Sequence, residues 1–190
     1  MTAYVKPRFR LPGQDQPDRP LPPVPRPDPV AVAIQQVRAT IWTADADYAD
    51  TRSRLYLGLA GREFALSIDE NDLARAARTT FVLGEEANID NAAGNDPRTP
   101  PFPWRDGEHP VYLRLETDGD EPAWLLEWAR IDINPDTDQA IAYEQPALPG
   151  PRPGHRLWLS DTTGKIVYLT RATTRPAPPA DTDPEPESQP

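Results

Sequence analysis

Apolar and polar residues alternate along most of the middle of the chain, which is the period that turns one face of a strand toward a core. VRATIWT, SRLYLGLAG and REFALSID all follow this pattern. The tight link at Gly61 predicts that the second and third of these segments form a hairpin. Further short strands are expected around Phe81 and Leu83, and from Val111 to Leu115.

The segment AWLLEWARIDI predicts a long strand with Trp124, Leu126 and Trp128 turned inward. A β-bulge between Trp128 and Ile131 would restore the alternation there. Shorter strands are expected at IAYEQ, RLWLS and KIVYLT, with a DTTG turn joining the last two as a hairpin. Residues 69–78 allow at most one helical turn. The pattern as a whole predicts an all-β fold, an antiparallel eight-stranded β-sandwich.

Proline divides the 190-residue chain, because nine of its 26 prolines fall in the first 30 residues and six in the last 20. Both ends lack large apolar residues, so we predict disordered Pro-rich tails at 1–32 and 171–190 around a folded body at 33–170. RPLPPVP, residues 19–25, places prolines three apart behind an arginine, a spacing that lets a polyproline helix present both to an aromatic groove. It is either a linker or a docking peptide.

A formal charge of −10 argues against nucleic acid as a partner. The chain has no cysteine, so thiolate metal sites and disulfides are impossible, and the common nucleotide-binding and hydrolase motifs are absent. His109 and His155 have no neighbouring group in the sequence that would orient them as a base. We therefore expect no catalytic residues and no enzyme activity.

Nothing in the sequence approaches the length of a transmembrane segment, and the first residues lack the apolar run of a signal peptide. The expectation is a soluble protein that is cytoplasmic or exported without a recognisable signal. Phe102 and Trp104, in PRTPPFPW, either cover a sheet edge or contact a partner protein.

Acidic residues gather in three of the predicted connections between strands. In an up-and-down succession these connections emerge at the same pole, where several loops could supply the six to eight oxygens that Ca²⁺ takes. Solvated acidic loops are the alternative. The acidic groups are Asp45, Asp47 and Asp50; Asp69, Glu70 and Asp72; and Asp118, Asp120 and Glu121.

The stretch from Val37 to about Leu159 resembles a PLAT domain, also called a lipoxygenase-homology domain. DTRSRLYLGLAGREFALS is similar to the second and third strands of that family, NDLARAARTTFVLG to its link into the fourth, and YLRLETDGDEPAWLLEWARI to its best-marked stretch. HRLWL is similar to the closing Trp-Leu. The resemblance implies a non-catalytic eight-stranded sandwich that binds membranes or proteins, often with calcium in loops at one end.

Carried onto this chain, the resemblance implies calcium ligands at Asp45, Asp47, Asp50, Asp118 and Asp120, a core tryptophan at Trp124 and a basic residue at Arg75. Together with the loop residues, this predicts a recognition module that docks on a partner protein or an anionic lipid surface, with Ca²⁺ as a candidate cofactor. The expected contact residues are Tyr48, Arg75, Phe102 and Trp104. The alternative is a cation-independent scaffold component of a larger bacterial or viral assembly. The sequence leaves the oligomeric state open.

Overall fold

The computed structural model describes residues 32–101, 103–105, 107–117, 123–148 and 155–173. Every regular element in these ranges is a strand, so the predicted all-β class is confirmed, and no helix long and apolar enough to cross a membrane occurs in them. The strands are β1 (Val32–Ala33), β2 (Gln36–Thr43), β3 (Arg54–Leu59), β4 (Arg62–Leu66), β5 (Arg78–Gly84), β6 (Pro103–Trp104), β7 (Val111–Glu116), β8 (Trp124–Ile133), β9 (Ile141–Glu144), β10 (Leu157–Leu159) and β11 (Ile166–Arg171).

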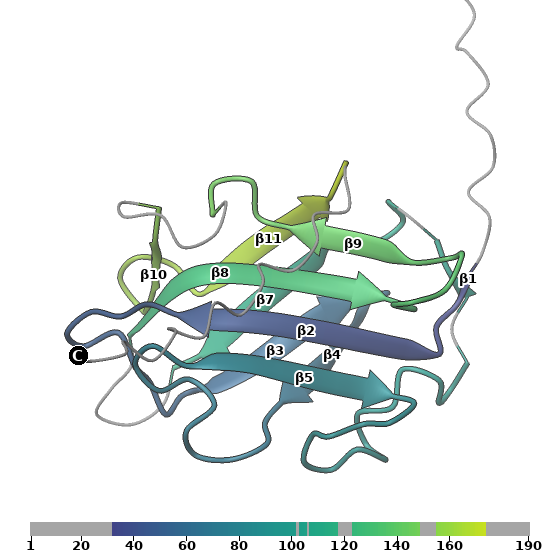
Figure 1. The fold of residues 1–190 in the computed structure, drawn as a ribbon, viewed down its shortest axis with the longest axis horizontal. Helices are drawn as coiled ribbons and strands as arrows, with labels where there is room; N and C mark the ends of the chain where they lie inside the picture. Colours follow the sequence, from purple (N-terminus) through teal and green to yellow (C-terminus); the bar gives the residue numbers. More distant parts are fainter. Residues whose placement is uncertain (1–31, 102, 106, 118–122, 149–154, 174–190) are drawn as a thin grey trace, which may run out of the picture.

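Eight strands form one antiparallel path in the order β4-β3-β7-β11-β9-β8-β2-β5, and β10 pairs with β8 beside it. The path folds over, so that β5, β2, β8 and β9 lie in front of β4, β3, β7 and β11 as two layers (Figure 1). β11 joins the layers, because residues 166–169 pair with β7 while residues 170–171 pair with β9. The predicted sandwich is therefore confirmed.

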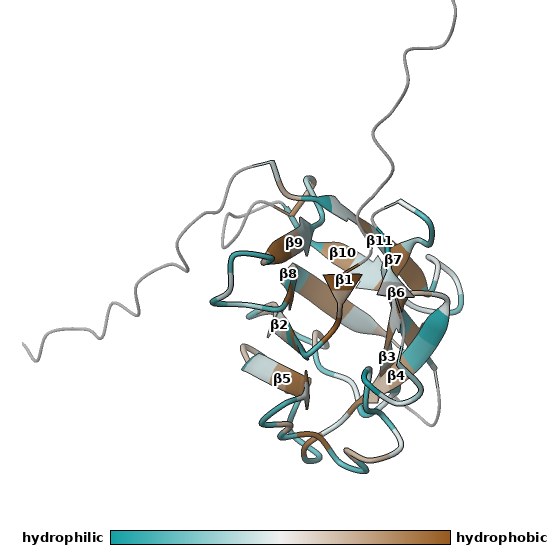
Figure 2. Cartoon of the chain, turned by 90° about the vertical axis from the view of Figure 1, so that its right-hand side faces the viewer, coloured by the Kyte–Doolittle hydropathy of each residue, from teal (hydrophilic) through white to brown (hydrophobic). Residues whose placement is uncertain are grey.

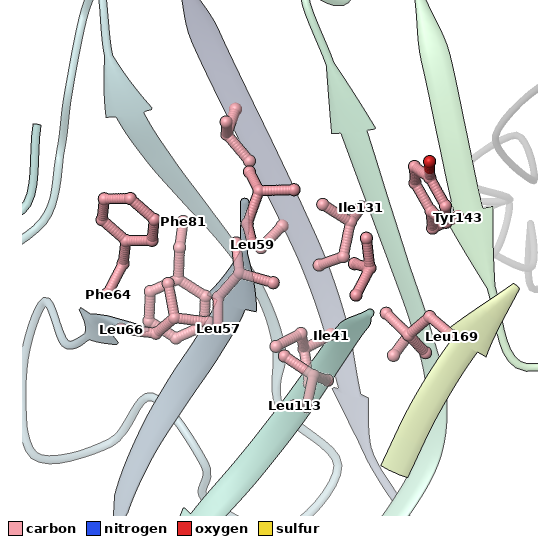
Figure 3. Packing of buried hydrophobic residues seen from close by; sticks show 14 of the residues in the cluster. Ile41, Leu57, Leu59, Phe64, Leu66, Phe81, Leu113, Ile131, Tyr143 and Leu169 are labelled. Carbon is pink, nitrogen blue, oxygen red and sulfur yellow. The ribbon is translucent and has the colours of Figure 1, made fainter. Parts of the chain in front are cut away.

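The core lies between the two layers and is built from the inward positions of the alternating strands (Figure 3). Val37, Ala39 and Ile41 on β2 are buried, as their spacing predicts, and Phe81, the strand partner of Ala39 on β5, is buried beside them. Trp124 is fully buried, and its indole N–H donates to the Thr43 hydroxyl at 2.9 Å. Because the buried polar atom has a partner, this large ring adds apolar burial without an unpaired donor.

The bulge in β8 occurs earlier than the alternation predicts. The register between β2 and β8 passes from Trp42 opposite Trp128 to Thr43 opposite Leu126, so Glu127 is the extra residue. Trp128 is thereby turned to the outer face, where its ring lies 4.8 Å from that of Trp42. The prediction that Trp128 points inward is wrong, because a bulge on the near side of a residue reverses its face.

Two local predictions after β4 and β10 also differ from the structure. Residues 69–77 form turns and bends with no helix among them, and Arg78 begins β5. The Ser160–Gly164 bridge closes a tight loop, yet β10 pairs with β8 and β11 with β7 and β9. The DTTG segment therefore carries the chain from one layer to the other, and the predicted hairpin is absent from this described part of the chain.

The long link after β5 covers the two edge strands of the path. Within residues 85–101, the Asn88 side-chain oxygen accepts from the Val82 N–H at 2.7 Å on the β5 edge. The Asn95 side-chain oxygen accepts from the Ala65 N–H at 2.8 Å on the β4 edge. Asparagine side chains thus satisfy edge amides that would otherwise invite pairing with another chain.

One end of the sandwich, which we call the plug end, is closed by β1, β6 and the loop 134–140. Figure 2 looks onto this end and shows β1 and β6 between the layers. β1 pairs with β6, placing Val32 opposite Trp104. Trp104 is only 2% exposed and packs edge-on against Tyr143 at 6.0 Å between ring centroids. The prediction that Trp104 contacts a partner is therefore wrong, since the ring is core.

Candidate functional site

The opposite end of the sandwich, which we call the loop end, consists of the loops 44–53, 67–77 and 160–165. The first two lie against each other, because the Ala76 N–H donates to the Ala44 carbonyl at 3.3 Å. Two of the three acidic connections therefore meet at one pole, as the succession of strands predicts. The third connection lies mostly in residues 118–122, which are outside the described residues.

Arg75 joins the two acidic loops at their surface. Its Nε donates to Asp45 at 2.6 Å and its Nη1 donates to Asp47 at 2.7 Å. The hydrogen bond that Arg75 donates to Asp45 is the main reason that the pKa of Arg75 lies above its ordinary value, so the guanidinium stays charged. All three side chains are at least half exposed, and such pairs fix the arrangement of loops more than they stabilise the fold.

Tyr48 stands at the tip of the first loop. Its side chain is 87% exposed and its backbone has φ 63°, in the left-handed region that non-glycine residues rarely adopt. The flanking Asp47 is held by Arg75, and Ala49 is fully buried on the other side. A large aromatic ring is therefore presented to solvent on a backbone that its neighbours hold in place.

A small apolar cluster supports this loop from below. Ala44, Ala49 and Leu125 are buried together, and the Leu125 N–H donates to the Ala49 carbonyl at 3.0 Å. Leu125 is also the strand partner of Trp158 on β10. Because Leu125 lies between them, Trp158 is two strand spacings from Ala49 in the tyrosine loop, about 10 Å.

Trp158 is 38% exposed, which makes it a second aromatic at the loop end that the sequence prediction missed. The alternation in RLWLS could have predicted the exposure of Trp158, because Leu159 faces the core and its neighbour on the strand must then face outward. Leu157, at 36%, is also partly exposed, but as the strand partner of core residue Leu126 it lies on the opposite face of β10 from Trp158.

Asp72 organises the second loop from within. Its side-chain oxygen accepts from the N–H groups of Ile68 at 2.6 Å and Asp69 at 3.2 Å. Burial raises the pKa of Asp72 despite these two bonds. The carboxylate is therefore occupied in shaping the loop.

The remaining predicted site residues divide into two groups. Asp50 is half-buried in the first loop. Asp118, Asp120 and Phe102 lie outside the described residues. Within the described ranges, no three His, Asp or Glu side chains are grouped so that they could hold a metal ion. Of the five predicted calcium ligands, the structure thus brings together Asp45 and Asp47, around a guanidinium.

The loop end carries a net negative charge. Its three loops contain seven acidic and three basic side chains. At neutral pH such a surface repels anionic lipid, and the repulsion falls off within about 10 Å at ordinary salt. Chemically, this end offers exposed aromatic rings together with an excess of acidic side chains.

No known protein family and no curated protein matches the chain. Solved structures are similar in fold at low identity. An alpha toxin from Clostridium absonum is 16% identical, with 76% of this chain and 33% of the toxin covered and a TM-score of 0.47. A coral 8R-lipoxygenase, described as activated by calcium through a C2-like domain, is 14% identical, with 72% and 17% covered and a TM-score of 0.46. The chain thus spans a third or less of the proteins it resembles.

Proposed function

We propose that this chain is a non-catalytic recognition module that docks on a lipid surface through its loop end. The observation that carries the proposal is Tyr48, 87% exposed on a left-handed loop tip. An aromatic ring with a polar hydroxyl suits the boundary between water and the headgroup layer, where the ring is shielded and the hydroxyl stays wet.

The arrangement around Tyr48 supports insertion by more than one residue. Trp158 and Leu157 lie on the same end of the sandwich and are partly exposed. Backbone hydrogen bonds from Ala76 to Ala44 and from Leu125 to Ala49 hold the tyrosine loop in place, so little conformational entropy would be lost when the tip enters the interface.

We further propose that calcium assists docking on anionic lipid by competing with Arg75. Asp45 and Asp47 both bind this guanidinium in the structure. A cation that took these carboxylates would offset the negative charge of the loops and release Arg75 for a lipid phosphate. The carboxylates of Asp50, Asp118 and Asp120 would complete the set of oxygens.

Vesicle sedimentation tests the proposal, with phosphatidylcholine vesicles that contain or lack phosphatidylserine, each with calcium and with chelator. The parent is expected to bind phosphatidylserine vesicles with calcium and to lose most of that binding with chelator. Tyr48→Ser should weaken binding several-fold. Tyr168→Ser, which removes another exposed tyrosine far from the loop end, is the matched control and should bind like the parent. Equal behaviour of the two variants would refute docking through the loop end.

The scaffold alternative has one observation in its favour, the exposed Tyr168 and Ile166 on the outer face of β11. If the protein is a scaffold that acts through this face, neither calcium nor Tyr48→Ser should change its sedimentation with vesicles. The same assay therefore separates the two functions.

A further inference from the structure

The outer face of the layer β4-β3-β7-β11 carries a strip that the loop end does not explain. Strand register places Glu63, Gly58, Tyr112 and Tyr168 in one row across the four strands. Tyr168 is 57% exposed, and its ring lies 5.9 Å from that of Tyr112. We call this row the tyrosine strip. It lies nearer the plug end, next to the β3–β4 turn and the last residues of β11 (Figure 1).

Gly58 gives the tyrosine strip its shape. A Cβ atom at Gly58 would come within 2.2 Å of the Tyr112 ring, so the ring lies down on the backbone of β3. The Tyr112 hydroxyl reaches across and donates to Glu63 at 3.1 Å. The result is a low aromatic surface that runs from Tyr168 to a carboxylate.

Glu63 ends the row as a carboxylate that can accept one more hydrogen bond. Its two oxygens accept two bonds from Arg114, both at 2.7 Å, and one from Tyr112. A carboxylate offers about four acceptor sites, so one is left for another donor. The bond from Arg114 is the main reason that the pKa of Glu63 lies below its usual range, which keeps it charged.

The chain itself contains a segment whose chemistry fits this strip. Residues 19–25, RPLPPVP, hold prolines at 22 and 25 behind Arg19. A polyproline helix rises about 3.1 Å per residue, so these seven residues span roughly 19 Å. The row from β4 to β11 covers three strand spacings, about 14 Å. The segment is thus about 5 Å longer than the row, so a helix with Arg19 at Glu63 and Pro22 at Tyr112 brings Pro25 to the far edge of Tyr168.

The segment is also within reach, because Pro25 precedes Val32 by seven residues and β1 closes the plug end, beside which the strip lies. Seven residues of polyproline cover about 22 Å. The first 30 residues carry five basic and three acidic side chains, against a body of strongly negative charge. Attachment to the same chain raises the local concentration of the segment and lowers the affinity that docking requires.

We propose that residues 19–25 dock in cis across the tyrosine strip as a polyproline helix. Arg19 donates to the remaining site on Glu63, Pro22 lies over Tyr112 on Gly58, and Pro25 lies against Tyr168. Aromatic rings present flat faces to proline rings, and a polyproline helix loses little entropy on binding because it is already extended. Docking covers the most exposed ring of this face.

The full-length chain allows a direct test, because it has no cysteine and accepts a spin label at one introduced site. Gln16→Cys places the label three residues before Arg19. The amide signals of Tyr112 and Tyr168 should be broadened in the ¹⁵N spectrum. Those of Thr40 and Thr80, on the outer face of the other layer, should keep their intensity.

Two variants, with a matched control, attribute the effect to the segment and the strip. Pro22→Gly combined with Pro25→Gly should abolish the broadening, whereas Pro27→Gly combined with Pro29→Gly should leave it. Tyr168→Ala should also abolish it while the rest of the spectrum stays unchanged, since the ring is exposed.

Three results would overturn the proposal. One is broadening that is equal on both faces or survives the change at prolines 22 and 25. Another is broadening of Tyr112 and Tyr168 from a label at Ser188→Cys alone, which would assign the strip to the C-terminal prolines. The third is broadening that appears only between chains, in a mixture of spin-labelled and ¹⁵N-labelled protein, which would make the occupant a second copy.

Discussion

The two ends of the sandwich are closed by different chemistry. At the plug end, Trp104 is buried between the layers, and the Asn134 side chain accepts from the Gln35 N–H at 2.8 Å and donates to the Ala33 carbonyl at 2.8 Å. At the loop end, three small or aliphatic residues form the only separate apolar cluster of the described chain, beneath loops held by exposed ion pairs.

The difference separates stability from recognition. Buried rings and hydrogen-bonded buried amides contribute kilocalories per mole to folding, whereas exposed ion pairs contribute little. The weakly stabilised end is the one that exposes Tyr48 and Trp158. We infer that the plug end maintains the fold, so that the loop end can keep aromatic rings in solvent.

The largest expected effect is at the plug end. Trp104→Ala should lower the free energy of unfolding by about 3–5 kcal/mol, because it removes a buried ring from the core. Trp158→Ala at the loop end should cost less than about 1 kcal/mol. Urea unfolding followed by far-ultraviolet circular dichroism measures both. Equal losses would mean that the two ends are packed alike.

Asn134 provides a polar version of the same contrast. Asn134→Ala should cost about 2 kcal/mol, since it removes a buried side-chain amide that pairs with the Gln35 N–H and the Ala33 carbonyl. Asn88→Ala removes a similar amide from the exposed β5 edge, where water can replace it, and should cost less than half as much. The urea midpoints of the two variants measure these losses. A larger loss of stability for Asn88→Ala than for Asn134→Ala would contradict the assignment of the plug end as the stable one.

At the loop end, Arg75→Ala should lower the free energy of unfolding by less than about 1 kcal/mol, because both of its pairs are exposed. The loss should shrink further as salt is added. Calcium affinity should rise, since Asp45 and Asp47 lose their competitor. Thermal melts in low and high salt and a calcium titration measure these effects. A loss of several kilocalories per mole would show that the loop end also carries stability.

The smallest expected effect is an increase in the free energy of unfolding. Ala76 has φ 60°, a left-handed conformation that favours glycine, so Ala76→Gly should stabilise the protein by roughly 0.5–1 kcal/mol. Ala74→Gly, two residues earlier and outside that region, should instead destabilise by a similar amount. Thermal melts of the pair test whether the loop end stores local strain.

Most of the fold could be predicted from the sequence because alternation reports which face of a strand is buried. β2, β3, β4 and β7 follow that pattern. The errors arise where the backbone departs from regular pairing. The break in the alternation predicts a bulge in β8 but not its position at Glu127, which reverses Trp128. The crossing of the loop after β10 between layers is not encoded in the period of the side chains.

The candidate site could be predicted only in part. The succession of strands brings the two described acidic loops together, and Tyr48 lies at a loop tip as expected. The pairing of Arg75 with both Asp45 and Asp47 could not be foreseen, because it depends on how two loops distant in sequence pack. Trp104 was misplaced because a Pro-rich segment reads as a loop, although its partner strand lies at residues 32–33.

The most direct test of docking through the loop end compares the two ends of one protein on a membrane. Asn71→Cys and Asp138→Cys each carry an environment-sensitive fluorophore at an exposed position, the first at the loop end and the second at the plug end. With calcium and vesicles of phosphatidylcholine and phosphatidylserine, emission from position 71 should shift to the blue while emission from position 138 stays unchanged. A blue shift at position 138, or at neither position, would contradict the assignment of the loop end as the docking surface.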